Sequence, residues 1–182
     1  MKKIVITYGL IAGLIVGGLM LASLPLWKSG AITFDNGELV GYTTMVIALS
    51  TIFIGIKSYR DNHAGGIITF WSGCKIGLLI TLIAGIMYAM AWEVSFANMG
   101  EEFTQKMTEH YLAEIQAGGA SEAELQKARE EWAAFSELYQ NPLVRFPITL
   151  LEILPVGIII TLLSAGLLRK KEFLPSAETN HA

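Results

Sequence analysis

Long apolar runs separated by polar segments dominate the chain, and four of them are long enough to cross a membrane. A bilayer core about 30 Å thick needs roughly 20 consecutive helical residues. The first two runs have an uncharged core, whereas the third contains only Lys75 and the fourth only Glu152. We therefore predict an all-α integral membrane protein with four transmembrane helices, at about residues 4–26, 39–57, 67–92 and 146–168.

The segment 93–142, between the third and fourth spans, has a different pattern. Apolar residues recur there every three or four positions, first at Phe96, Met99, Phe103, Met107, Tyr111 and Ile115, then at Leu125, Ala128, Trp132, Phe135 and Tyr139. Gly118 and Gly119 separate the two stripes, and Ser121 with Glu124 forms a capping-box signature. We predict an extracytoplasmic amphipathic helical hairpin between spans three and four, whose first arm can continue the third span.

Two interpretations of the hairpin stripes stay open, namely mutual packing and a ligand groove. The sequence favours mutual packing, because two short amphipathic helices have to bury their apolar faces to be stable.

Composition agrees with a membrane protein and excludes a soluble domain. Of the 182 residues, 53% are hydrophobic and 16% are charged, and the mean hydropathy is +0.50. The start Met1-Lys2-Lys3 followed by an apolar run also resembles a cleaved signal peptide. That run exceeds the usual apolar region of roughly 7 to 15 residues, so we expect the first span to be retained.

The distribution of Lys and Arg predicts the orientation, because these residues stay on the cytoplasmic side of short loops during insertion. Eight of the 13 fall on one side of the four-span arrangement, including the cluster Arg169-Lys170-Lys171 after the last span. Twelve of the 16 acidic residues fall on the other side. We predict that both termini are cytoplasmic and that the polar tail 172–182 is disordered.

Small residues recur at four-residue intervals within the spans, which permits close helix packing. They include Gly9, Gly13 and Gly17 in the first span and Gly73 and Gly77 in the third. We predict a tight four-helix bundle rather than a conduit, since almost no ionisable residue remains to line a water-filled path.

Ionisable residues inside spans are functional candidates, because burying them without compensation costs at least a few kcal/mol. A Lys75 to Glu152 ion pair is one hypothesis. Lys75 lies toward the cytoplasmic end of its span and Glu152 toward the opposite end of the next, which places them about 18 Å apart in depth. The sequence therefore favours a Lys75 side chain that extends to the cytoplasmic surface without pairing with Glu152.

Glu152 is the second candidate, and Thr43, Thr44 and Tyr88 should lie at a similar depth. Each could donate a hydrogen bond to its carboxyl group. A structural hydrogen bond is favoured over a proton-carrying site, which normally needs several such groups. Pro155 removes the hydrogen bond to the Leu151 carbonyl and should bend the helix beside Glu152.

Two motifs resemble a family of bacterial four-span proteins known as domain of unknown function 4199. The first is Gly55-Ile56-Lys57-Ser58-Tyr59-Arg60-Asp61 followed by Gly65-Gly66 and Phe70, and the second is Glu152-Ile153-Leu154-Pro155-Val156-Gly157 before the basic cluster. The resemblance covers essentially the whole chain and implies a multi-pass protein of the bacterial inner membrane, without an established activity.

The resemblance also directs attention to a predicted cytoplasmic loop from Lys57 to Gly66. Its Lys57, Arg60 and Asp61 could bind lipid phosphates or a partner. The alternative, which the positive-inside rule favours, is that the two basic residues only fix the orientation.

Other chemistry finds little support. The single Cys74 forms no intramolecular disulfide, and His110 with Glu114 makes only half of a metal site. Nucleotide-binding and hydrolase motifs are absent from the sequence. We predict no metal, no cofactor and no nucleic-acid partner.

These observations favour a structural or interaction component of a membrane complex, in contact with the lipid bilayer and with a membrane-protein partner or a second copy. The alternatives are a small transporter or proton-coupled subunit that uses Glu152 and, third, a membrane-embedded enzyme.

Overall fold

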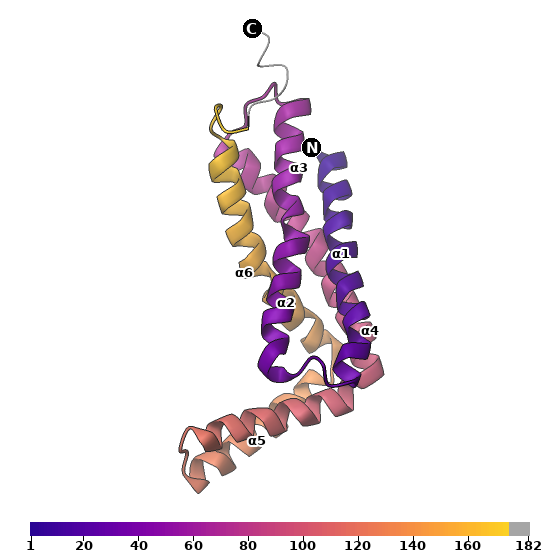
Figure 1. The fold of residues 1–182 in the computed structure, drawn as a ribbon, viewed down its shortest axis with the longest axis vertical. Coiled ribbons are helices and arrows are strands. Elements are labelled where there is room, and N and C mark those ends of the chain that lie inside the picture. The colour runs from indigo at the N-terminus through magenta and orange to yellow at the C-terminus, as the bar shows by residue number, and fades with distance from the viewer. Residues whose placement is uncertain (175–182) are drawn as a thin grey trace.

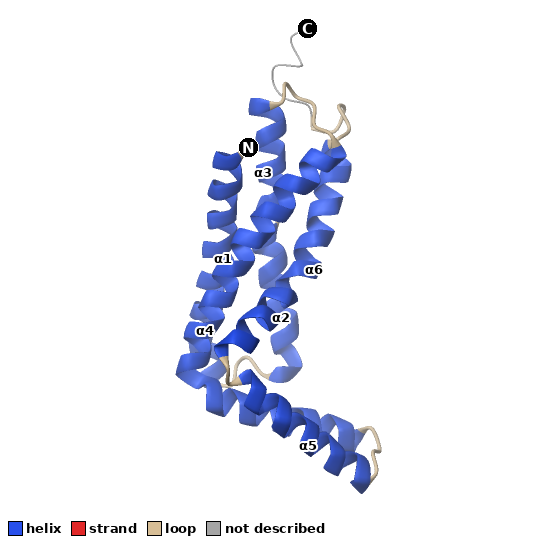
Figure 2. Ribbon diagram, turned by 180° about the vertical axis from the view of Figure 1, so that it is seen from behind, coloured by secondary structure: helices blue, strands red, loops and turns tan. Residues whose placement is uncertain are grey.

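The computed structural model describes residues 1–174, apart from the side chain of Glu101, and every regular element within them is an α-helix (Figures 1 and 2). The helices are α1 (Lys2–Lys28), α2 (Phe34–Leu49), α3 (Thr51–His63), α4 (Phe70–Ala117), α5 (Glu122–Tyr139) and α6 (Pro142–Leu168). The tail predicted to be disordered lies outside the described residues from residue 175 onward.

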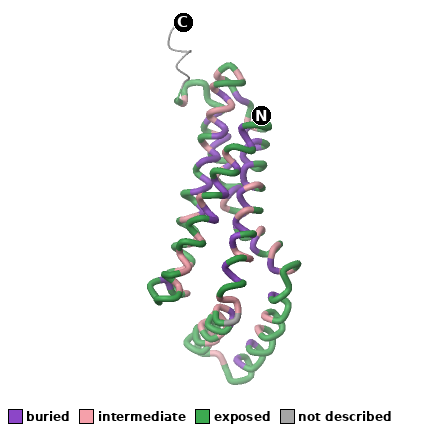
Figure 3. The backbone as a smooth tube through the Cα atoms, turned by 90° about the vertical axis from the view of Figure 1, so that its right-hand side faces the viewer, coloured by how far each residue is buried: buried purple, intermediate pink, exposed green. Residues whose placement is uncertain are grey.

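Four helical stretches are long and apolar enough to cross a membrane, which confirms the prediction of four spans in an all-helical chain. They are Lys2–Lys28, Phe34–His63, Phe70–Gly100 and Pro142–Leu168. Large apolar side chains such as Leu14, Leu163 and Leu151 are exposed on their outer surfaces. In Figure 3 exposed positions recur along the outside of these helices while buried positions face inward, as expected where lipid is the solvent.

The second span consists of two helices that meet at Ser50, where a single helix was predicted. The Ser50 hydroxyl donates to the Ile47 carbonyl at 2.6 Å, and the Thr51 hydroxyl donates to the Ala48 carbonyl at 2.7 Å. Hydroxyl groups that bond to carbonyls of the preceding turn compete with the backbone and often bend a helix.

The segment from Lys57 to Gly66 is also different from the predicted loop. α3 remains helical to His63, so Lys57, Arg60 and Asp61 lie on a helix. The turn follows it and includes Gly65 and Gly66, whose φ angles of 62° and 80° are left-handed and favour glycine.

α4 is a 48-residue helix that passes through the bundle and continues into the arm that packs with α5 (Figure 1). Its C-terminus is followed by Gly119 at a φ of 86°. The α5 N-terminus has the predicted capping box: the Glu124 carboxylate accepts a hydrogen bond from the Ser121 backbone N–H at 2.8 Å.

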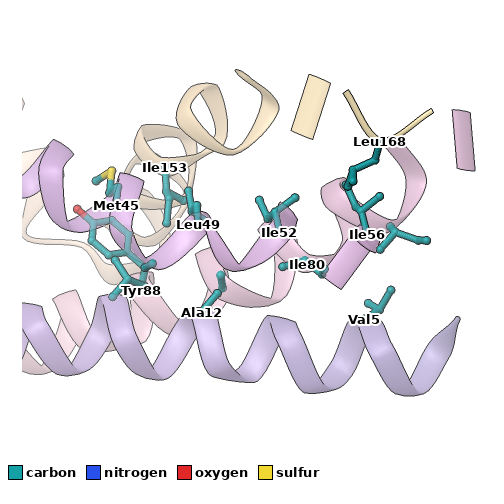
Figure 4. Close-up of a cluster of buried hydrophobic side chains, with 14 of the residues drawn as sticks. Val5, Ala12, Met45, Leu49, Ile52, Ile56, Ile80, Tyr88, Ile153 and Leu168 are labelled. Carbon is teal, nitrogen blue, oxygen red and sulfur yellow. The ribbon is translucent and has the colours of Figure 1, made fainter. Parts of the chain in front are cut away.

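Glycines set the contacts between the long helices. Gly9, Gly13 and Gly17 of α1 face residues 83, 87 and 91 of α4, a constant offset that shows the two helices running in parallel. Gly73 and Gly77 of α4 face residues 165 and 161 of α6, so this pair is antiparallel. The predicted small-residue faces therefore lie in helix contacts. α2, α3 and α4 add a buried apolar cluster that includes Met45, Leu49, Ile52, Ile56 and Tyr88 (Figure 4).

Candidate ligand-binding site

A hollow of about 900 Å³ lies where the bundle meets the α4–α5 arm. Its walls come from the second half of α1, the first half of α2, and α4, with contributions from α5 and α6. Pockets that bind small organic ligands typically measure about 300 to 1,000 Å³, so the hollow is of ligand-binding size.

Aromatic rings form one side of the hollow and join three elements. The Trp27 ring of α1 lies 5.4 Å from the Phe34 ring of α2, and Phe103 of α4 lies 5.3 Å from Phe34 and 6.0 Å from Trp27. Edge-to-face contacts of this kind favour a fixed ring geometry. This cluster holds the arm of α4 against the ends of α1 and α2.

Glu152 of α6 also lines the hollow, together with Tyr88, Tyr139, Thr44 and Gly41. Tyr88, which was expected at a similar depth to Glu152, lines the same hollow. The Glu152 side chain is exposed although protein surrounds it, because it faces open space rather than a packed helix.

Glu152 has no basic partner among the residues that the structure describes. Lys75 is exposed on α4 and forms no ion pair with another residue of the described range 1–174. Pro155 lies inside α6, one turn beyond Leu151, and the helix continues through it to Leu168.

Three further acidic residues line the hollow: Asp35 and Glu38 at the start of α2, and Glu114 in the arm of α4. His110, which also lines it, lies 3.7 Å from Glu114 and stacks on Phe34 with ring centroids 5.5 Å apart. The described lining residues include no Lys and no Arg. The charge of the hollow is therefore acidic.

The two apolar stripes of the arm pack against each other and also line the hollow. Tyr111 of α4 packs on Trp132 of α5 with ring centroids 4.6 Å apart. Phe103, Met107, Tyr111, Trp132 and Tyr139 also line the hollow. The stripes therefore pack against each other along one side and face open space along another.

A buried arginine that the sequence reasoning did not single out fixes the base of the arm. Arg145, at the start of α6, donates from its Nε to Glu93 of α4 at 3.0 Å and forms a second hydrogen bond to the same carboxylate through Nη2. Its Nη1 donates to the carbonyls of Tyr139 and Gln140 at the end of α5. The guanidinium lies 3.8 Å from the centre of the Phe96 ring.

Tyr139 connects this ion pair to the hollow. Its hydroxyl accepts a hydrogen bond from the Trp92 indole N–H at 2.9 Å. Burial raises the pKa of Tyr139, so the side chain remains a neutral phenol near pH 7. No specific sequence signal indicates this arrangement beyond the apolar spacing of Tyr139.

The residues predicted at the Lys57 to Gly66 segment lie at the other end of the bundle. Arg60 is buried and donates to the carbonyls of Phe173 at 2.9 Å and Leu174 at 2.5 Å, and to Asp61 at 2.7 Å. Lys57 pairs with the second oxygen of Asp61 at 2.5 Å. These groups hold the end of α6 to α3, and the Arg60 side chain is turned away from the surface.

The part of the chain that the structure describes contains no group of three His, Cys, Asp or Glu side chains placed to hold a metal ion. Cys74 is buried in α4 as a free thiol.

The fold and the site together define a class of protein: an all-helical chain with four potential membrane spans and an acidic, aromatic-walled hollow beside them. The chain belongs to the family described as "Protein of unknown function (DUF4199)", whose model matches residues 7–170, most of its length. The resemblance drawn from the sequence motifs is thereby confirmed. Neither the curated proteins nor the solved structures contain a match.

Proposed function

We propose that this protein binds a small apolar ligand in the hollow between the bundle and the α4–α5 arm. The observation that carries the proposal is the hollow itself, about 900 Å³ of space among packed helices, walled by aromatic rings and reached by a few polar groups. A largely apolar wall with a small number of polar side chains is typical of ligand sites.

The topology that accompanies this proposal is the one predicted from the sequence. The chain is a multi-pass protein of the bacterial inner membrane, with both termini in the cytoplasm and the helical hairpin on the outer side. The positive-inside distribution of Lys and Arg supports it, and places the hollow toward the outer surface of the membrane.

The sequence favours an interaction component of a membrane complex, and ligand binding is one form of that role. A bound ligand would also stabilise the arm against the bundle. The second candidate is a proton-coupled transporter subunit, which is favoured by the position of Glu152 on the hollow without a basic partner among residues 1–174. A membrane-embedded enzyme has no comparable supporting geometry.

Two glycines provide a matched test of the hollow. A Cβ atom added at Gly41 or at Gly18 meets no other atom within 4 Å, but Gly41 lines the hollow whereas Gly18 is exposed on α1 outside it. Gly41→Phe should therefore fill the hollow, while Gly18→Phe should project away from it.

Intrinsic fluorescence supplies the measurement, because Trp27, Trp92 and Trp132 line the hollow and the fourth tryptophan, Trp71, is 77% exposed elsewhere. In a Trp71→Phe background reconstituted in nanodiscs, bromoalkyl probes with cationic, neutral or anionic head groups are titrated as quenchers. At least one probe should give saturable quenching that Gly41→Phe abolishes and Gly18→Phe preserves. Linear quenching by all three probes, equal in both variants, would refute the binding site.

A further inference from the structure

The hollow is acidic, which is unusual beside helices that are long and apolar enough to span a membrane. Four acidic side chains line it, with no lysine or arginine among the described lining residues. Glu152 belongs to an apolar helix of a length that spans a membrane, where an ionised carboxylate without a partner is costly. A bound cation would compensate that charge.

Arg145, a basic group that is buried at this end of the bundle, does not compensate the charge of Glu152. Arg145 lies two turns before Glu152 on the same helix, about 10 Å along the axis. Its guanidinium is already occupied by Glu93 and by the carbonyls of Tyr139 and Gln140. Glu152 therefore remains available to a ligand.

Aromatic side chains beside Glu152 add a second feature that favours cations. Tyr88, Trp92 and Tyr139 line the hollow with Glu152. The faces of such rings attract organic cations, most strongly when the pair is desolvated. Aromatic walls also accommodate an apolar body.

We propose that the ligand is a hydrophobic organic cation, an ammonium group carried on an apolar body, with Glu152 as its counter-ion and the neighbouring aromatic rings as its cage. This inference rests on the proposed function, because it names the chemical class that the hollow selects. A bare metal ion fits less well, since the described residues contain no cluster of three metal-ligating side chains.

Glu152 is a better anchor than the other acids of the hollow. All four side chains are exposed, but Asp35, Glu38 and Glu114 lie within four residues of a helix end, whereas Glu152 lies ten residues inside α6. Ion pairs near bulk water contribute little, because water and salt screen them. A carboxylate among apolar helices is screened far less.

The quenching titration tests this class directly when three probes of equal chain length are compared: a bromoalkyl trimethylammonium, a bromoalkyl alcohol and a bromoalkyl sulfate. The ammonium probe should bind at least about tenfold more tightly than the alcohol, and the sulfate should bind worst. Glu152→Gln should remove the preference for the ammonium head while the alcohol still binds, whereas Glu130→Gln, on α5 outside the hollow, should keep it.

The outcomes separate this inference from the proposed function. In one outcome, binding is saturable and Gly41→Phe abolishes it, but the unaltered protein binds the ammonium and alcohol heads equally. This outcome would support the ligand site and overturn the selection of cations. That comparison needs no substitution at Glu152. A preference for ammonium that persists in Glu152→Gln and disappears in Glu38→Gln would overturn Glu152 as the anchor.

Discussion

The Arg145 guanidinium and the Glu93 carboxylate form a two-point ion pair that joins the start of α6 to the middle of α4. The Arg145 side chain is 6% exposed and the Glu93 side chain 24%. Because the same guanidinium also binds two carbonyls at the end of α5, it ties three helices together where the arm leaves the bundle.

Arg145→Ala should therefore destabilise the protein strongly. Removing one partner of a buried ion pair leaves the other charge uncompensated and typically costs about 3 to 5 kcal/mol. Thermal unfolding in detergent measures the change. The matched control is Lys106→Ala in the exposed Lys106–Glu102 pair, which should cost no more than about 0.5 kcal/mol. Equal melting temperatures for the two variants would show that the buried pair has no special weight.

The contact between α1 and α4 gives a second prediction. A Cβ atom at Gly9 would lie 2.8 Å from the Cβ of Ile83, closer than real contacts allow. Gly9→Ala should separate the two helices and lower stability by about 1 to 3 kcal/mol, as overpacking usually does.

Gly18→Ala is the control for this effect, because the added methyl group meets nothing within 4 Å. It should leave the melting temperature unchanged or slightly higher, since alanine favours helix over glycine. Equal destabilisation by both substitutions would contradict a role for close packing at Gly9.

Much of this fold follows from patterns that are local in the sequence. Uncharged stretches of about 20 residues identify spans because the bilayer imposes that length. The spacing of Gly9, Gly13 and Gly17 identifies a helix contact because residues four apart share a face. The cap at Ser121 is likewise local, as its two partners are three residues apart.

The candidate site was harder to predict from the sequence, because its residues are far apart in the chain and meet only in the folded structure. Counting residues along the spans predicted that Tyr88 and Thr44 lie at a similar depth to Glu152. The spacing of residues in the sequence did not show that open space lies between their helices. The sequence did not single out Arg145, because its partner Glu93 is 52 positions away and no local pattern joins the two. Arg60 was expected to bind lipid phosphates or a partner, or only to fix the orientation, because its acceptors Phe173 and Leu174 are more than a hundred positions away and no local pattern indicates them.

The capping box of α5 predicts a pH dependence of the arm. Hydrogen bonds from the Ser121 backbone and hydroxyl to Glu124 lower the pKa of that carboxyl below its ordinary value of about 4.5. A group whose pKa is lowered by folding stabilises the folded state above its unfolded pKa, and this contribution is lost as the pH falls through the folded pKa. Amide protection in the first turn of α5 should therefore decrease below about pH 4.5.

Glu124→Gln should remove that part of the pH response, because an amide does not titrate. Glu137→Gln, near the other end of α5 and outside the capping box, should retain it. Protection factors from amide hydrogen exchange, compared at each pH with the unaltered chain, measure both variants. An unaltered pH response in Glu124→Gln would show that other carboxylates cause it.

Arg60 provides a prediction that separates a structural role from lipid binding. Its Nε and both Nη atoms already donate to Asp61 and to the carbonyls of Leu168, Phe173 and Leu174, and its side chain is 1% exposed. Arg60→Lys keeps the charge but loses the planar arrangement of donors that reaches several acceptors. Amide exchange in residues 169–174 should therefore become about tenfold faster, the equivalent of about 1.4 kcal/mol.

The same geometry predicts that Arg60 does not recognise lipid phosphates. Reconstitution into vesicles with and without anionic lipid, followed by thermal unfolding, should give the same lipid-dependent shift for Arg60→Lys as for the unaltered chain. Lys57→Ala is the comparison, because Lys57 is 33% exposed and shares Asp61 with Arg60. Two results together would contradict the structural role of Arg60: a lipid-dependent shift that disappears in Arg60→Lys, and unchanged amide exchange in residues 169–174. The guanidinium would then have to leave its carbonyl acceptors to reach the membrane surface.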